Sequence, residues 1–180
     1  MAESAGTGGK LGFLAKGVAQ IGFVVKDAER TARAFWRLFG IGPWRFYTYG
    51  RPLVKRMTRH GKPAEYRMRV ALADAGPVRL ELVQPLEGDT VYSEFVRRHG
   101  YGIQHLGVLV EKMETAVREA AAAGLEVTMD GAGFGLDGDG HYAYLDTEDE
   151  IGTVLELIER PKRRAEPEMV YPPEKPGSAS

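Results

Sequence analysis

Residues 102–110 read GIQHLGVLV, and they repeat a stretch that the chain has already used near its start. The earlier stretch, residues 18–27, reads VAQIGFVVKD, and Gln20 stands there where His105 stands in the later one. Both stretches are rich in β-branched and apolar residues over the length of a strand, so each predicts a β-strand. A strand sequence that occurs twice, each time with a polar residue near its start, indicates two copies of one structural unit.

The segments that follow the two strands are also alike. Residues 28–39 carry apolar side chains at helical spacing, between Asp27, a favourable N-cap residue, and Gly40, a favourable end. Residues 112–123 repeat this pattern in the second copy, where Gly124 ends the helix. Three β-like runs come after each helix. Each copy therefore predicts a strand–helix–strand–strand–strand unit, or βαβββ module.

The two copies end alike as well. Residues 80–84 read LELVQ and residues 155–159 read LELIE, so that Glu81 matches Glu156. An internal repeat of this length predicts two modules that bury their apolar faces together. We therefore expect an α+β fold in which paired βαβββ modules form one cupped mixed sheet, with the helices on its outer face.

The organisation of the chain follows from this repeat. Residues 89–100 have a helical pattern that begins after an N-cap residue, Asp89 or Thr90, and ends at Gly100. The last twenty residues are rich in proline and in charged residues. The expected segments are a flexible N-terminal tail (1–16), the first module (17–85), a linker helix (86–101), the second module (102–160) and an irregular C-terminal tail (161–180).

The alternation of side chains along these strands predicts a site. Ile21 and Phe23 are apolar and must pack on a helix, so their neighbours face the other side of the sheet. In the second module Leu106 and Val108 are apolar in the same way, and leucines flank Glu81 and Glu156 in both LEL sequences, so the polar residues there also face away from the helices. Gly22 and Gly107 lie close by and leave room in the cup. The polar residues expected on this concave face are Gln20, Glu81, His105 and Glu156.

One amide, one imidazole and two carboxylates form a set of mixed N and O donors that suits a divalent metal ion. The two carboxylates neutralise a 2+ charge. We therefore predict that these four residues bind one divalent ion, which the sequence leaves open among Zn, Ni, Co, Mn and Mg. Glu81 and Glu156 occupy equivalent places in opposite modules and could flank a bound carbon from two sides, so they are also the candidate catalytic acid and base.

Composition excludes several other classes of protein. The chain has 180 residues, 43% hydrophobic and 27% charged, without an apolar run long enough to cross a membrane. A net charge of −1 argues against general binding to nucleic acid. The absence of cysteine excludes disulfides and thiolate sites and fits a cytoplasmic protein, and the N-terminus lacks a secretory signal pattern.

Charge is unevenly distributed along the chain. Residues 51–69 hold seven Lys or Arg and one acidic residue, whereas residues 126–158 hold nine Asp or Glu and no Lys or Arg. Most of these side chains are expected to be solvated surface. The basic run is also a candidate landing site for an anionic group of a substrate.

Over about residues 17–160 the chain resembles the vicinal oxygen chelate superfamily, which includes glyoxalase I, methylmalonyl-CoA epimerase, extradiol dioxygenases and bleomycin-resistance proteins. The resemblance implies paired βαβββ modules with metal ligands on the first and last strand of each. Those positions match Gln20, Glu81, His105 and Glu156. Residues 80–110, LELVQPLEGDTVYSEFVRRHGYGIQHLGVLV, are most similar to the methylmalonyl-CoA epimerase branch.

Gln20 departs from that branch, whose members usually have histidine at the first ligand position. The set Gln, Glu, His, Glu resembles that of some glyoxalase I enzymes, and it does not fit extradiol dioxygenases, whose iron triad needs two His and one Glu. The resemblance implies a metal-dependent epimerase or isomerase that acts on a carbon next to a carbonyl, methylmalonyl-CoA-epimerase-like, on an acyl-CoA or glutathione thioester, as a homodimer. A glyoxalase I-like lactoylglutathione lyase and a non-catalytic, bleomycin-resistance-like binding protein stay open as alternatives.

Overall fold

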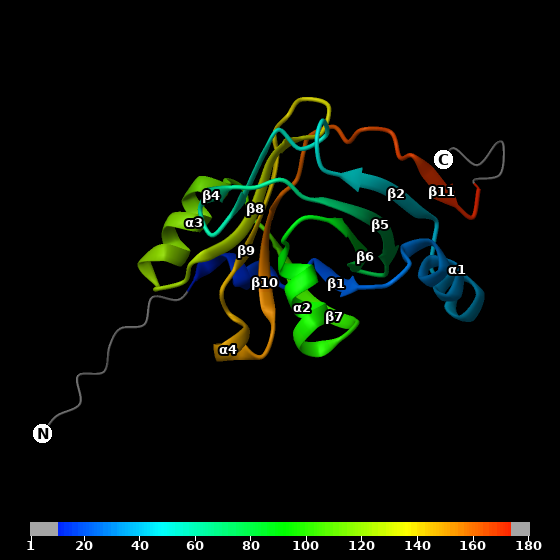
Figure 1. Cartoon of the computed structure of the whole chain (residues 1–180), viewed down its shortest axis with the longest axis horizontal. Helices are drawn as coiled ribbons and strands as arrows, with labels where there is room; N and C mark the ends of the chain where they lie inside the picture. The colour runs from blue at the N-terminus through cyan, green and yellow to red at the C-terminus, as the bar shows by residue number, and fades with distance from the viewer. Residues whose placement is uncertain (1–10, 174–180) are drawn as a thin grey trace, which may run out of the picture.

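The computed structural model describes residues 11–173 (Figure 1). Within them one curled mixed sheet has the strand order β11-β2-β5-β6-β1-β7-β10-β9-β8-β3-β4. The elements are η1 (Gly12–Lys16), β1 (Gln20–Val24), α1 (Ala28–Phe39), β2 (Trp44–Tyr49), β3 (Arg56–Arg59), β4 (Lys62–Pro63), β5 (Arg67–Ala75), β6 (Val78–Glu87), α2 (Val91–His99), β7 (Gly102–Leu109), α3 (Met113–Ala122), β8 (Val127–Phe134), β9 (Gly140–Leu145), α4 (Glu148–Ile151), β10 (Val154–Glu159) and β11 (Met169–Tyr171).

The two modules join through their equivalent first strands. β1 pairs antiparallel with β7, and each of these strands pairs in parallel with the last strand of its own module, β6 or β10. Both modules thus contribute to one sheet within a single chain. The expected α+β fold, with paired βαβββ modules in a cupped mixed sheet, is confirmed.

Helices α1 and α3 cover the outer face of the curled sheet on opposite sides of the molecule (Figure 1). α1 begins after Asp27, whose carboxylate accepts a hydrogen bond of 2.9 Å from the backbone N–H of Arg30, and ends at Gly40 in the left-handed region, with φ 68°. Buried alanines face the sheet in both helices, so the helices approach it closely. The helices expected at 28–39 and 112–123 are confirmed. No helix of the described residues is long and apolar enough to span a membrane.

The helix expected between the modules is α2, and its first turn is fixed by a reciprocal cap. The Thr90 hydroxyl accepts from the backbone N–H of Ser93, and the Ser93 hydroxyl accepts from that of Thr90, both at 3.0 Å. Tyr92 in this turn is buried in the same core cluster as residues of β5, β6 and β9. α2 therefore contributes to the interior of the cup as well as connecting the modules.

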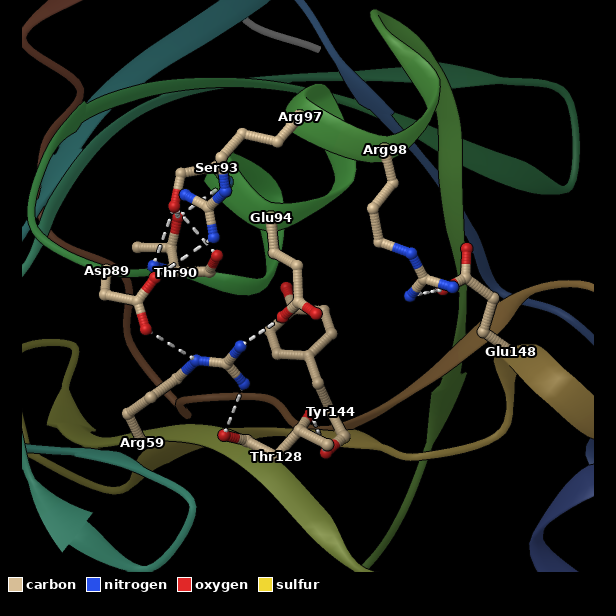
Figure 2. A network of polar contacts seen from close by, with 10 residues as sticks. All are labelled: Arg59, Asp89, Thr90, Ser93, Glu94, Arg97, Arg98, Thr128, Tyr144 and Glu148. Atoms are coloured by element: carbon tan, nitrogen blue, oxygen red, sulfur yellow. Dashed lines mark hydrogen bonds and ion pairs between the residues drawn. The ribbon is translucent and has the colours of Figure 1, made fainter.

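The basic run at residues 51–69 contains a hairpin that the sequence did not predict. β3 and β4 belong to the first half of the chain, yet β3 pairs antiparallel with β8 of the second. Arg59 on β3 reaches α2 and contacts Glu94, Asp89 and the backbone carbonyl of Thr128 (Figure 2). Five arginines of the run form ion pairs within the chain: Arg51–Glu65, Arg56–Asp130, Arg59–Glu94, Arg67–Glu87 and Arg69–Glu168. Each of these arginines thus has an acidic partner, and the role of the run as a landing site for an anionic group of a substrate stays a prediction.

Arg59 gives a test of how α2 is held in place. Only 10% of its side chain is exposed, and Arg59→Met removes the cation that pairs with Glu94 and one of the two donors to the Thr128 carbonyl, which keeps the hydrogen bond from the backbone N–H of His60. We expect this change to lower the free energy of unfolding by about 2 kcal/mol. Arg67→Met is the matched control, because the Arg67–Glu87 pair is exposed, and it should cost less than about 0.5 kcal/mol. Urea denaturation measures both values, and equal losses would contradict a clamping role for Arg59.

Two expectations about the ends of the chain need correction. Residues 12–16 of the expected flexible tail form η1, and Phe13 is buried against the core under α3. Within the expected irregular tail after residue 160, β11 adds to the edge strand β2. Both arrangements depend on partners far away in the sequence, so local patterns did not predict them. Residues 1–10 and 174–180 of these tails lie outside the described part of the chain.

Candidate metal centre

The four predicted ligands lie on four neighbouring strands in the middle of the sheet. Gln20 is on β1, Glu81 on β6, His105 on β7 and Glu156 on β10, and the strand order is β6-β1-β7-β10. All four side chains are buried, and His105 has no exposed surface. The structure therefore brings together every residue that the alternation along the strands had selected.

The donor atoms converge on one point. Nε2 of His105 lies 3.1 Å from Oε2 of Glu81 and 3.3 Å from Oε2 of Glu156, and Nε2 of Gln20 donates to Oε2 of Glu156 at 2.9 Å. Glu81 Oε2 and His105 Nε2 are buried and have no hydrogen-bond partner of acceptable geometry. Ligand atoms that each lie about 2.1 Å from one ion are about 3.0–3.4 Å apart, so these residues fit a metal ion.

Two glycines make this approach possible. A Cβ atom added at Gly22 would lie 1.9 Å from Cε1 and 2.0 Å from Nε2 of His105. One added at Gly107 would lie 2.8 Å from Cβ of Gln20 and 3.2 Å from Oε2 of Glu156. The expectation that both glycines leave room for the polar residues is therefore confirmed.

Further side chains orient the cluster. Oε1 of Gln104 lies 2.8 Å from Nδ1 of His105, which places the proton on Nδ1 and turns Nε2 toward the carboxylates. The Tyr144 hydroxyl donates to Oε1 of Glu156 at 2.6 Å, and the Tyr92 hydroxyl lies 2.6 Å from that of Tyr144. Sequence reasoning missed these residues. For Tyr144 there was a signal, because the strand HYAYL alternates tyrosine with small or apolar residues.

Burial and neighbouring charges set the protonation of the cluster. Burial alone would lower the pKa of His105, but Glu156 and Glu81 outweigh it and raise that pKa to about 9. Burial raises the pKa of Glu81, and the charge of Glu156 raises it further. Burial also raises the pKa values of Tyr92 and Tyr144 well above the ordinary value, so both stay neutral hydrogen-bond donors. The metal-free cluster thus holds a proton at neutral pH.

Metal binding is therefore expected to release about one proton at pH 7.5, because Nε2 of His105 must lose its proton before it can bind an ion. The folded-state pKa lies above the ordinary 6.5, so the proton is present below pH 9 and leaves as pH rises through that value. Apparent metal affinity should rise about tenfold per pH unit up to about pH 9 and then level off. Calorimetry in buffers of different ionisation enthalpy counts the proton. An affinity independent of pH between 7 and 8.5 would contradict the expectation.

The cluster opens into a small pocket of about 30 Å³. Its walls are mainly apolar and aromatic, and they come from β2, β5, β8, β9, β10 and α2. Among residues 11–173, Glu81 and Glu156 are the only carboxylate residues in this lining, and Arg164 is its only cation. Any proton transfer by a carboxylate in this pocket therefore falls to the two predicted ligands.

A comparison with models of protein families shows which family the chain belongs to. A model described as the Glyoxalase/Bleomycin resistance protein/Dioxygenase superfamily matches residues 19–144. The chain belongs to this superfamily. Gln20, Glu81 and His105 lie inside the matched region, and Glu156 follows it on the last strand of the second module. The resemblance drawn from the repeated strands is thus confirmed at the level of the superfamily.

Solved structures with the same fold include two methylmalonyl-CoA epimerases. The enzyme from Mycobacterium tuberculosis is 20% identical, with 81% of this chain and 89% of that chain covered and a TM-score of 0.56. A Streptomyces coelicolor epimerase in complex with 2-nitronate-propionyl-CoA is 18% identical, with 78% and 94% covered and a TM-score of 0.55. A hypothetical protein from Bacillus halodurans is 18% identical, with 82% and 96% covered and a TM-score of 0.57. A search of curated protein sequences finds no significant match. At these identities the likeness establishes the fold alone.

Proposed function

We propose that the protein is a metal-dependent isomerase that moves a proton at a carbon next to a carbonyl. Epimerisation of a thioester such as methylmalonyl-CoA is its best candidate reaction. The observation that carries this proposal is the buried convergence of His105, Glu81 and Glu156, in which Nε2 of His105 and Oε2 of Glu81 lack hydrogen-bond partners. Membership of a superfamily that contains metal enzymes supports the proposal further.

The metal would be held by His105, Glu81, Glu156 and the amide oxygen of Gln20. Amide oxygen and nitrogen exchange places when the group turns over, so the present contact of Gln20 with Glu156 is compatible with this role. A bound divalent ion supplies a Lewis acid that polarises a substrate carbonyl and makes the neighbouring C–H bond more acidic. The choice among Zn, Ni, Co, Mn and Mg remains open.

The two carboxylates would carry the proton. Glu81 and Glu156 come from opposite modules, so one takes the proton from the reacting carbon and the other returns one on the opposite face. Tyr144 holds Oε1 of Glu156 and thereby directs Oε2 toward the cluster. The apolar pocket walls keep bulk water away from the reacting carbon.

An acyl-CoA thioester is the first substrate candidate. One structural neighbour is a methylmalonyl-CoA epimerase in complex with methylmalonyl-CoA, and another binds 2-nitronate-propionyl-CoA. A glyoxalase I-like lactoylglutathione lyase is the second candidate, favoured by the donor set Gln, Glu, His, Glu. A protein that only binds ligands has no need for the buried cluster, which counts against that alternative. A homodimer and a cytoplasmic location stay predictions.

Solvent exchange tests the reaction directly. In deuterated water, metal-loaded protein should introduce deuterium at the α-carbon of methylmalonyl-CoA faster than a protein-free control, as followed by mass spectrometry. Glu81→Gln and Glu156→Gln should each suppress the labelling, because each removes a proton acceptor. Conversion of the hemithioacetal of methylglyoxal and glutathione, without labelling of the CoA ester, would favour the lyase. If neither methylmalonyl-CoA nor the hemithioacetal reacts, the protein is not an isomerase of either substrate and the proposed function is wrong.

A further inference from the structure

The two carboxylates of the cluster have different neighbours, although the internal repeat makes them equivalent. In the strand pairing Tyr144 of β9 lies opposite Glu156, whereas Leu72 of β5 lies opposite Glu81. The Tyr144 hydroxyl donates to Oε1 of Glu156 at 2.6 Å, a length typical of a hydrogen bond to a charged oxygen. Within residues 11–173 no hydroxyl donates to Glu81, and its Oε2 lacks any hydrogen-bond partner. One carboxylate is therefore held and the other is free to turn.

A second tyrosine supports Tyr144 from the linker helix. The hydroxyl of Tyr92 on α2 lies 2.6 Å from the hydroxyl of Tyr144. A hydroxyl has one hydrogen, and Tyr144 donates its own to Glu156, so Tyr92 is the donor between the two tyrosines. Burial holds the pKa of both hydroxyls well above the ordinary value, so both keep their hydrogens. Two hydrogen bonds in series thus lead from α2 to Oε1 of Glu156.

The rings that carry these hydroxyls are tightly packed. Tyr92 and Tyr144 are each 1% exposed, and their ring centroids lie 5.5 Å apart in an edge-to-face arrangement. The Tyr144 ring also packs edge-to-face on the His105 ring at 5.2 Å. Arg59 holds α2 in place through its ion pair with Glu94 (Figure 2). Neither tyrosine can therefore move away from Glu156 without disturbing the core.

This restraint has a consequence for the way in which Glu156 binds a metal ion. A carboxylate can bind an ion through one oxygen or through both. Oε2 of Glu156 lies 3.3 Å from Nε2 of His105, inside the cluster, while Oε1 accepts from Tyr144. Binding through both oxygens would leave the buried Tyr144 hydroxyl without its acceptor, which is unfavourable. Binding through Oε2 alone keeps a coordination position open for a substrate oxygen.

We propose that Tyr144 and Tyr92 are positioning residues that make Glu156 bind the metal ion through Oε2 alone. This inference rests on the metal-dependent function proposed above, and it deepens that function by naming what keeps a coordination position open. Glu81, opposite Leu72, is then the carboxylate that can change its orientation at the ion. The difference between the two glutamates comes from the residues that lie opposite them in the sheet.

The visible absorption of cobalt-loaded protein tests this role without a substrate, because four-coordinate cobalt absorbs more strongly than five- or six-coordinate cobalt. In Tyr144→Phe the absorbance per bound cobalt should fall by about half or more, because Glu156 can then bind through both oxygens. Cobalt affinity should fall about tenfold. Tyr92→Phe should cause a smaller change in the same direction. Tyr66→Phe is the matched control, because this equally buried hydroxyl donates to the backbone carbonyl of Asp130 at 2.6 Å, and it should keep the wild-type spectrum.

The outcomes separate the positioning role from the isomerase function. A Tyr144→Phe protein with the wild-type spectrum overturns the positioning role, and so does a Tyr66→Phe protein that changes as much as Tyr144→Phe. Should Tyr144→Phe fail to fold, an unchanged spectrum in Tyr92→Phe overturns it instead. A wild type that binds no cobalt overturns both the role and the metal-dependent function. A protein that shows the expected spectra but converts neither methylmalonyl-CoA nor the hemithioacetal keeps the positioning role and loses the isomerase function.

Discussion

His105→Ala is expected to lower the affinity for zinc or cobalt by about 10²- to 10³-fold, because it removes one of four donors at a site whose other ligands stay in place. The imidazole is the only nitrogen ring in the cluster, and its Nε2 faces both carboxylates. Glu156→Gln should lower the affinity for a related reason, since it removes one of the charges that neutralise the ion. Gln20→His should preserve or tighten binding, because imidazole is the better ligand for such ions.

Competition with a chromophoric chelator measures these affinities. His99→Ala is the control, because this half-exposed histidine lies on α2 and pairs with Glu148, away from the cluster. It should bind metal as the wild type does. Thermal melting of each variant shows that the fold is retained. If His105→Ala and the wild type bind metal equally well, these four residues are not the metal site.

Gly22→Ala should reduce metal affinity almost as strongly, although the residue itself has no donor atom. The new methyl group would occupy the space of the His105 ring, with contacts of 1.9–2.4 Å to its atoms. Because both strands belong to the centre of the sheet, the ring must move rather than the backbone. We expect a loss in affinity on the order of 100-fold, together with destabilisation from overpacking of about 1–3 kcal/mol.

Gly102→Ala is the matched control, because Gly102 lies on the same strand as His105 and an added Cβ meets nothing within 4 Å. Its metal affinity and stability should stay close to the wild type. Chelator competition and urea denaturation on both variants make the comparison. A Gly22→Ala protein with wild-type affinity would show that the His105 ring is not required in its present position.

The repeated strand and helix pattern was sufficient to predict the fold, because each βαβββ module is defined by local alternation and helical spacing. The same alternation selected Gln20, Glu81, His105 and Glu156. Their sequence neighbours Ile21 and Leu106 are apolar and pack against the helices, which leaves the polar side chains on the concave face. The alternation of side chains between the two faces of a strand is a property of the backbone. The face on which each side chain lies could therefore be predicted without knowledge of distant contacts.

Contacts between distant segments could not be predicted in this way. The pairing of β3 with β8 joins the two halves of the chain, and it engages Arg59 with α2 where the sequence indicated only a run of positive charge. Ion pairs of this kind depend on which acidic residues the fold brings near. Local patterns do not predict β11 either. This strand of three residues forms because the edge strand β2 offers it backbone hydrogen bonds.

The sequence by itself thus determined the superfamily fold and the face on which the four polar residues lie. Tertiary structure alone decided that their strands are neighbours, that Tyr144 holds Glu156, and that Arg164 reaches the same pocket from the C-terminal segment. The physical reason is the separation along the sequence of the residues that interact. Alternation and helical spacing act over a few residues, whereas a distance of 3.1 Å between His105 and Glu81 depends on how two strands pair.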